Sequence, residues 1–175
     1  LVTSGFVVIG DAAGQTMPMT GCGAGGAMMG GKLAAETIIA GQTKGKADIA
    51  SLWSYNHKWF VQSGRGAHYA ALTALRNILQ KLPHEDNSFL FNKDIFSGEM
   101  LTSSINGTFQ IPTPRLMIKT LINCISRPSL LLTLNKATTL GTQLYKHYLN
   151  YPSAWNSNCF EQWQQKARRL IAKGG

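Results

Sequence analysis

Apolar and polar positions divide the chain into a short β-like opening and a long helical remainder. Residues 6–9 form a continuous apolar run rich in β-branched side chains, which is typical of a strand buried on both faces. A glycine-rich loop follows this run. Small apolar residues then predict a helix over about residues 23–40, with Gly41 as its C-terminal stop.

Helical spacing dominates after residue 45. Asp48 is a candidate N-cap for a helix that is interrupted by glycines in residues 64–66. Residues 67–82 place apolar side chains on one face and end at Pro83, whereas residues 84–112 give only a weak signal. Further amphipathic helices are expected near residues 115–125, 128–151 and 158–172, with Pro128 in the first turn of the middle one.

The apolar opening cannot fold by itself, because a buried strand needs a paired neighbour on each side. Residues 1–45 are therefore expected to be the last strand–helix unit of a larger α/β domain whose earlier strands lie outside this chain. Residues 46–175 are expected to form a helical region that packs after it. The predicted fold class is α+β, mostly α-helical within this sequence.

The composition is that of a globular chain, with 44% of its 175 residues apolar and 14% charged. The net charge of +9 is concentrated in one half. Residues 1–99 carry 8 basic and 7 acidic residues, whereas residues 100–175 carry 9 basic residues against Glu161 alone. Such a basic half indicates an anionic partner such as phospholipid, pyrophosphate or nucleic acid, or else a solvated face that aids solubility.

Metal sites and disulfide scaffolds are not expected. Cys22, Cys124 and Cys159 lie far apart without a CxxC pair, and the four histidines share no ligand spacing with them. No run of about 18 apolar residues and no signal peptide is visible in the sequence. The expected location is the cytoplasm, with peripheral membrane contact left open.

The candidate chemistry lies in residues 10–25. Asp11 follows the predicted strand, where a carboxylate accepts hydrogen bonds from ligand hydroxyls in the crevice outside a sheet. Ala12, Ala13 and Gly14 let the backbone approach a bulky cofactor. The glycine-rich start of the helix presents free N–H groups and a positive dipole end to negative charge. The alternative is a tight turn whose glycines serve packing alone.

The order of these residues resembles a known signature. A strand, then Gly10-Asp11-Ala-Ala-Gly14, a proline at Pro18 and Thr-Gly-x-Gly ending at Gly23 resemble the second flavin-binding signature of para-hydroxybenzoate hydroxylase-like flavoproteins. Among these, Gly14-Gln15 and the small residues 32–35 are most similar to the geranylgeranyl reductases, which reduce isolated double bonds of isoprenoid chains. The resemblance is strong over residues 6–40 and looser beyond, where Tyr148, Tyr151 and Pro152 fit only generally.

The resemblance implies FAD as the cofactor. Asp11 would bind the ribityl hydroxyls, the backbone from Gly10 to Ala13 would pass the pyrophosphate, and Pro18 would lie beside the isoalloxazine ring. The amides from Gly21 to Gly25 would face the pyrimidine edge. The implied cofactor-binding set is Gly10, Asp11, Ala12, Ala13, Pro18, Gly21, Cys22, Gly23, Ala24 and Gly25. No catalytic acid or base is assigned.

Parts of that family's pattern do not occur here. The G-x-G-x-x-G unit for the ADP half of FAD is missing, and residues 21–26 have the wrong spacing for it. The family's substrate-cavity motif is missing too, so the chain is expected to be inactive alone. Cys22 stands where many relatives have glycine, and it either fills space or brings a thiol to the flavin.

Three function classes follow. The first is a geranylgeranyl reductase-like enzyme with a hydrophobic isoprenoid substrate and either NADPH or ferredoxin as electron donor. The second is a flavin-dependent aromatic monooxygenase or halogenase. The third is a non-catalytic helical module that binds anionic lipid or nucleic acid, whereas the flavoenzyme reading expects no nucleic-acid partner. Arg115, Lys119 and Arg127 alternate with apolar residues and are the expected membrane contacts.

The aromatic residues at helical spacing after residue 50 have two readings. They form core or inter-helix contacts, or they line a tunnel for a lipid chain. They are Trp53, Tyr55, Trp59 and Phe60.

Overall fold

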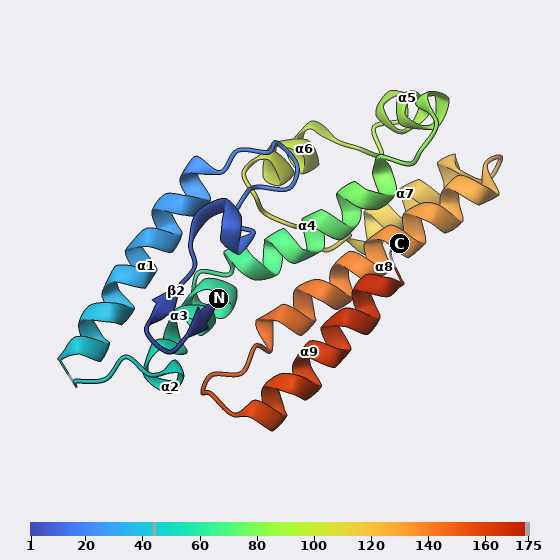
Figure 1. The fold of residues 1–175 in the computed structure, drawn as a ribbon. Helices are drawn as coiled ribbons and strands as arrows, with labels where there is room; N and C mark the ends of the chain where they lie inside the picture. Colours follow the sequence, from blue (N-terminus) through green and yellow to red (C-terminus); the bar gives the residue numbers. More distant parts are fainter. Residues whose placement is uncertain (44, 174–175) are drawn as a thin grey trace.

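The computed structural model describes residues 1–43 and 45–173, and it is mostly helical (Figure 1). The chain opens with two short strands, a 3₁₀ turn and a long helix. These are β1 (Val2–Thr3), β2 (Phe6–Val7), η1 (Gly10–Ala13) and α1 (Ala24–Gln42).

The remaining elements are helices of very different lengths. They are α2 (Ile49–Leu52), α3 (Ser54–His57), the π-helical turn η2 (Lys58–Gln62), α4 (Arg65–Leu79), α5 (His84–Asn92), α6 (Gly98–Ile105), α7 (Pro114–Asn123), α8 (Pro128–Leu149) and α9 (Ser157–Ala172). The predicted class, a small β opening followed by a mostly helical chain, is confirmed.

The strand predicted over residues 6–9 differs from the observed one. β2 ends at Val7 and pairs antiparallel with β1, Val2 opposite Val7. Phe6 is 58% exposed and Ile9 44% exposed, so burial on both faces is wrong for the chain as described. A strand is buried on both faces only when other strands and helices cover it. Within the described residues, β2 pairs with β1 alone.

α1 runs two residues beyond its predicted end. Gly41 does not stop it but lies buried inside its last turn. A Cβ on Gly41 would lie 2.9 Å from the Lys46 carbonyl oxygen, and the Lys46 N–H donates to the Gly41 carbonyl. Glycine is therefore needed there because the chain folds back onto the helix, which sequence spacing does not reveal.

The predicted cap at Asp48 is confirmed. The predicted break over residues 64–66 is confined to Gly64, because α4 begins at Arg65 and ends at Leu79 rather than spanning residues 67–82. The Asp48 carboxylate accepts a hydrogen bond from the Ser51 N–H at 2.8 Å and caps α2. Gly64 adopts φ +67° and separates η2 from α4. The weak signal over residues 84–112 corresponds to two short helices, α5 and α6.

The main core lies between α4 and α8, which run side by side, with α9 against α8 (Figure 1). Ala71, Leu72 and Ala137 are fully buried there. A Cβ on Gly141 would lie 3.0 Å from the Phe109 ring. Small residues at this contact let the two helix backbones approach closely, so the packing leaves no room for a larger side chain.

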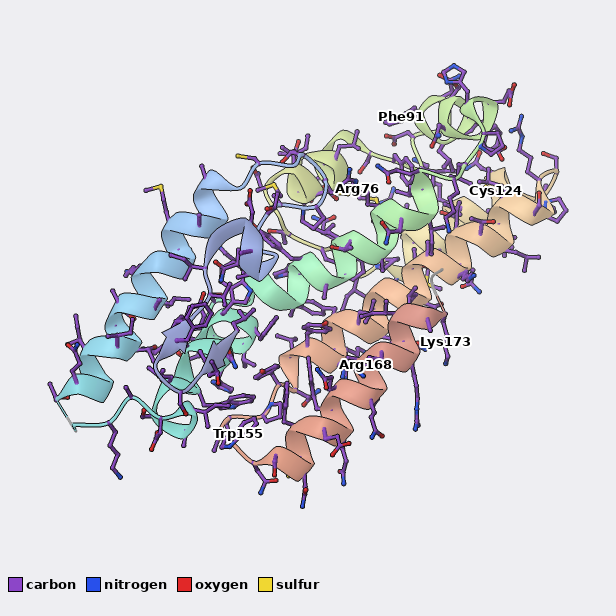
Figure 2. All side chains as sticks on the ribbon, viewed as in Figure 1. Arg76, Phe91, Cys124, Trp155, Arg168 and Lys173 are labelled. Carbon is purple, nitrogen blue, oxygen red and sulfur yellow. The ribbon has the colours of Figure 1, made fainter. Side chains whose placement is uncertain are left out.

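A cluster of aromatic rings joins α3 and η2 to the turn between α8 and α9. The Trp53 indole N–H donates to the Pro152 carbonyl at 2.8 Å, and the Phe60 and Tyr151 rings stack with centroids 4.7 Å apart. Trp155, labelled in Figure 2, packs on Trp53 from the same turn. Trp53, Tyr55 and Trp59 are buried, which confirms the core reading of this set.

None of the helices in the described ranges is long and apolar enough to cross a membrane.

Enlarging a side chain between α4 and α8 should destabilise the chain. We expect Ala71→Leu to lower the free energy of unfolding by about 1–3 kcal/mol, because overpacking forces rotamers and backbone to shift. Urea denaturation measures this. Ala35→Leu, at an exposed position of α1, is the matched control and should change stability by less than about 0.5 kcal/mol. Equal effects of both substitutions would contradict close packing at Ala71.

Candidate functional site

The predicted site residues are brought together at one end of α1. The chain leaves β2, forms η1, loops back and enters α1, so that η1 lies across the first turn of the helix (Figure 1). A Cβ on Gly10 would lie 3.6 Å from the Ala27 Cβ, and one on Gly23 would lie 2.5 Å from Asp11 Oδ1. Asp11 and Gly23, which are 12 residues apart in the sequence, therefore touch, and Gly10 lies close to Ala27.

Asp11 holds its carboxylate over the start of α1. The Thr16 hydroxyl donates to Asp11 Oδ1 at 2.5 Å. Asp11 itself is exposed. Gly23 lacks the side chain that would push this carboxylate away. The carboxylate is thus fixed at one oxygen and open to solvent, the arrangement that a hydroxyl-bearing ligand requires.

The first turn of α1 is open. Its N-cap is Gly23, which has no side chain, and no side chain caps the turn. Ala24 and Gly25 are exposed, and a Cβ on Gly25 would meet nothing within 4 Å. A helix start of this kind offers backbone N–H groups and a positive dipole end to a polar or anionic ligand.

Glycine is required in the loop by its backbone. Gly10, Gly14 and Gly21 adopt φ of +67°, +64° and +73°, which side chains disfavour. The loop closes on itself through hydrogen bonds from the Met17 N–H to the Cys22 carbonyl (3.0 Å) and from the Gly21 N–H to the Met17 carbonyl (2.9 Å). It is a defined turn rather than a loose connection.

The remaining predicted residues differ in exposure. Ala12 is exposed and Ala13 is half-buried, so the backbone of η1 is accessible. Pro18 is buried and supports the loop from inside. Cys22 carries a free, exposed thiol, so it fills no packing space among the described residues.

The sequence analysis assigned no role to Gln15, which proves central. Gln15 is fully buried. Its Oε1 accepts from the Gly10 N–H at 2.7 Å and its Nε2 donates to the Tyr55 hydroxyl at 2.7 Å. The Tyr55 hydroxyl donates in turn to the Val8 carbonyl at 3.1 Å.

Two glycines of α1 make room for Gln15. A Cβ on Gly26 would overlap the Gln15 carbonyl oxygen, and one on Gly30 would overlap the side-chain amide. Both glycines are buried. Their spacing of four residues puts them on one helix face, a signal in the sequence that pointed to packing of a neighbour as well as to a ligand.

In the described part of the chain, no group of three or more His, Cys, Asp or Glu side chains could hold a metal ion.

Most of the chain is similar to part of a known protein. No protein-family profile matches the chain. The glycine-rich strand–loop–helix and the helices after it are similar to part of an oxidoreductase, specifically a reductase. That relative is the digeranylgeranylglycerophospholipid reductase of Sulfolobus acidocaldarius, 29% identical over 171 residues. The match takes in 97% of this chain and 37% of the relative.

The similarity to a geranylgeranyl reductase is therefore confirmed, and it extends well past residues 6–40. Because the chain spans only 37% of the relative's length, it corresponds to part of such a protein. This is consistent with a C-terminal part.

Two neighbouring glycines of α1 should respond oppositely to alanine. Gly26→Ala should cost about 2–3 kcal/mol of stability, because its Cβ meets backbone that cannot move away. Gly25→Ala should raise stability by up to about 1 kcal/mol, because its Cβ enters open space and alanine favours helix. Thermal unfolding of both variants measures the difference. A loss at Gly25 equal to that at Gly26 would contradict the packing described.

Proposed function

We propose that residues 10–25 hold the flavin half of FAD in an oxidoreductase of the geranylgeranyl reductase type. One observation carries the proposal: the Asp11 carboxylate is fixed above the open first turn of α1. The alternative reading, glycines for packing alone, accounts for Gly26 and Gly30. It does not account for Gly25, where an added Cβ would meet nothing within 4 Å among the described residues.

The residues present fit a flavin. Exposed Ala12, Ala24 and Gly25 form a surface without bulky side chains, over which a long flat ligand can lie. Asp11 offers acceptors for ribityl hydroxyls, and the first-turn amides of α1 offer donors. These donors stabilise negative charge on a reduced ring.

In this proposal the cofactor carries out the chemistry and the protein positions it, as in other cofactor-dependent enzymes. Bound FAD supplies hydride transfer, and the protein binds, orients and tunes it. Here Asp11 would hold the ribityl chain. The amides from Gly21 to Gly25 would face the ring's polar edge, and Thr16 would keep Asp11 in place.

The relative's name supports a hydrophobic isoprenoid substrate. We propose reduction of double bonds in such a chain as the reaction of the complete protein, with NADPH or ferredoxin as electron donor. A flavin-dependent monooxygenase or halogenase would carry the same loop. Oxygen consumption by the reduced flavin in the presence of substrate separates those enzymes from a reductase.

The exposed apolar face of the opening unit supports a larger flavin domain. Met28 and Ile39 on α1 are 78% and 61% exposed, and Phe6 and Ile9 of the same opening unit are 58% and 44% exposed. Apolar surface of this extent is unusual on a completed domain. We propose that residues 1–45 complete a domain formed by other parts of a longer protein, as the length of the relative suggests.

Replacing Asp11 should weaken FAD binding in the full-length protein. Asp11→Ala removes charge-assisted hydrogen bonds worth roughly 1.5–3 kcal/mol each, so affinity should fall at least about tenfold. Asp11→Asn should be milder, because the amide oxygen still accepts. Flavin fluorescence during FAD titration measures both.

The matched control for Asp11 is Asp48→Ala. It removes an exposed carboxylate that caps α2, so it should cost stability and leave FAD affinity unchanged. Full flavin content and unchanged affinity in Asp11→Ala would show that Asp11 does not bind the cofactor. A complete protein that never binds flavin would leave only the helical-module reading.

We also propose peripheral membrane contact, through a surface that differs from the predicted one. Of the three basic residues expected to contact the membrane, Arg115, Lys119 and Arg127, the last two form ion pairs within the chain. Lys119 Nζ lies 2.8 Å from Asp94 Oδ2, and Arg127 Nη1 lies 2.6 Å from Asp86 Oδ1. Because a neighbouring acid offsets the charge of each, we propose a membrane contact that does not depend on these two residues.

An apolar strip on and after α7, which we call the α7 face, is the better contact. It lies at the end of the molecule far from α2 (Figure 1). Its members are 54–79% exposed and recur at helical spacing, as on helices that lie in a membrane interface. They are Met117, Ile118, Leu121, Ile122 and Ile125.

Basic residues elsewhere in the C-terminal half supply the attraction to anionic lipid. Arg168 and Lys173 extend from α9 into solvent (Figure 2). Each basic residue close to an anionic surface contributes about 1 kcal/mol. This attraction is long-range and screened by salt over about 8 Å, whereas the apolar contact is not.

Charges placed on the α7 face should abolish vesicle binding. We expect full-length protein to co-sediment with anionic vesicles, less so as salt rises, and the double variant Ile122→Asp/Ile125→Asp to stay in solution. Ile105→Asp, at a 54% exposed isoleucine of α6, is the control and should bind like the wild type. Equal binding of all three proteins would contradict insertion of the α7 face.

A further inference from the structure

We propose that Gln15 and Tyr55 are positioning residues that set the Asp11 carboxylate for flavin binding. This inference rests on the proposed function. It adds a route by which the helical part of the chain, through α3, controls a site formed by the strand–loop–helix. The route runs through hydrogen bonds from Tyr55 to Gln15 and from Gln15 to the peptide that precedes Asp11.

Gln15 has one position available to it. Its side chain is fully buried, and α1 encloses it because any side chain at Gly26 or Gly30 would overlap it. Both ends of its amide are used, the oxygen by the Gly10 N–H and the nitrogen by the Tyr55 hydroxyl. Rotating the amide by 180° would set two donors against each other at Gly10.

The Gln15 side chain fixes the backbone on which Asp11 stands. It holds the Gly10 N–H at 2.7 Å, while the Gln15 N–H donates to the Gly10 carbonyl at 3.1 Å. Gly10 is thus held from both sides in its left-handed conformation, φ +67°. The next side chain along, Asp11, then lies over Gly23 at the start of α1.

Tyr55 decides the orientation of Gln15. Its hydroxyl accepts from Gln15 Nε2 and donates to the Val8 carbonyl. Burial raises the pKa of this phenol, partly offset by the hydrogen bond from Gln15, so the neutral form that both hydrogen bonds require is the one present. Without the hydroxyl, a buried amide N–H and a carbonyl lose their partner.

α3 is held in place by the turn between α8 and α9. Asn56, which follows Tyr55, donates to the Tyr151 hydroxyl at 3.1 Å, and Trp53 donates to the Pro152 carbonyl at 2.8 Å. Tyr55 therefore transmits the position of the turn between α8 and α9 to the loop around Asp11. The two parts of the chain act as one unit at this point.

The test is Tyr55→Phe in the full-length protein, which keeps the ring and removes only the hydroxyl. We expect FAD affinity to fall roughly tenfold, as for the loss of about one buried hydrogen bond. Tyr69→Phe is the matched control, because Tyr69 is also buried but its hydroxyl has no hydrogen-bond partner among residues 1–43 and 45–173. It should leave FAD affinity unchanged.

A double-mutant cycle shows whether the effect passes through Asp11. In an Asp11→Ala background, Tyr55→Phe should weaken FAD binding by less than about twofold, because the group it positions is gone. Hydrogen exchange of the peptide containing Gly10 gives a second readout without flavin. Exchange there should be roughly tenfold faster in Tyr55→Phe and unchanged in Tyr69→Phe.

Each outcome decides the question. Weaker FAD binding, faster exchange and non-additivity with Asp11→Ala support the proposal. Additive effects, or faster exchange with unchanged FAD affinity, overturn it while leaving flavin binding intact. If the wild-type protein binds no FAD, the proposed function fails and this inference with it, and the exchange data then report only the packing of Gln15.

Discussion

The burial of one amide side chain, Gln15, is the constraint on which the candidate site depends. An amide buried at 0% exposure is tolerable only when its donors and acceptors are paired. Its partners are the Gly10 N–H and the Tyr55 hydroxyl, so the loop, α1 and α3 must meet at one point. Glycine destabilises a helix relative to alanine, yet Gly26 and Gly30 are required in α1, because any larger residue there would overlap Gln15.

Small residues also allow neighbouring segments to pack closely in the helical part. α4 and α8 pack through Ala71 and Ala137, and Gly41 lets the chain turn back at the far end of α1. Aromatic rings then fill the space between α3, η2, α8 and α9. This support behind Tyr55 lets a site made by the first 25 residues depend on Tyr151, whose hydroxyl accepts from Asn56 across 95 positions of the sequence.

Two apolar surfaces remain uncovered, and they differ in character. The surface around Met28 and Ile39 continues from a hairpin whose own strands are open, and it fits the interior of a larger domain. The α7 face is a helical strip in a basic half of the chain, and it fits a lipid surface. Local ion pairs such as Arg127 with Asp86 show that net charge by itself does not identify the contacting residues, because part of that charge is offset by acids within the fold.

The sequence by itself determined the class of the chain, the positions of its longer helices to within a few residues, the Asp48 cap and the segment that carries the candidate site. These features follow from local periodicity, capping chemistry and the order of residues between Gly10 and Gly25. Only the tertiary structure decided that Gln15 is buried, that Gly41 lies inside a helix, that Phe6 is exposed and that Lys119 and Arg127 are paired. Each of those facts depends on contacts between residues distant in sequence, or on partners outside the chain, and local patterns carry no information about either.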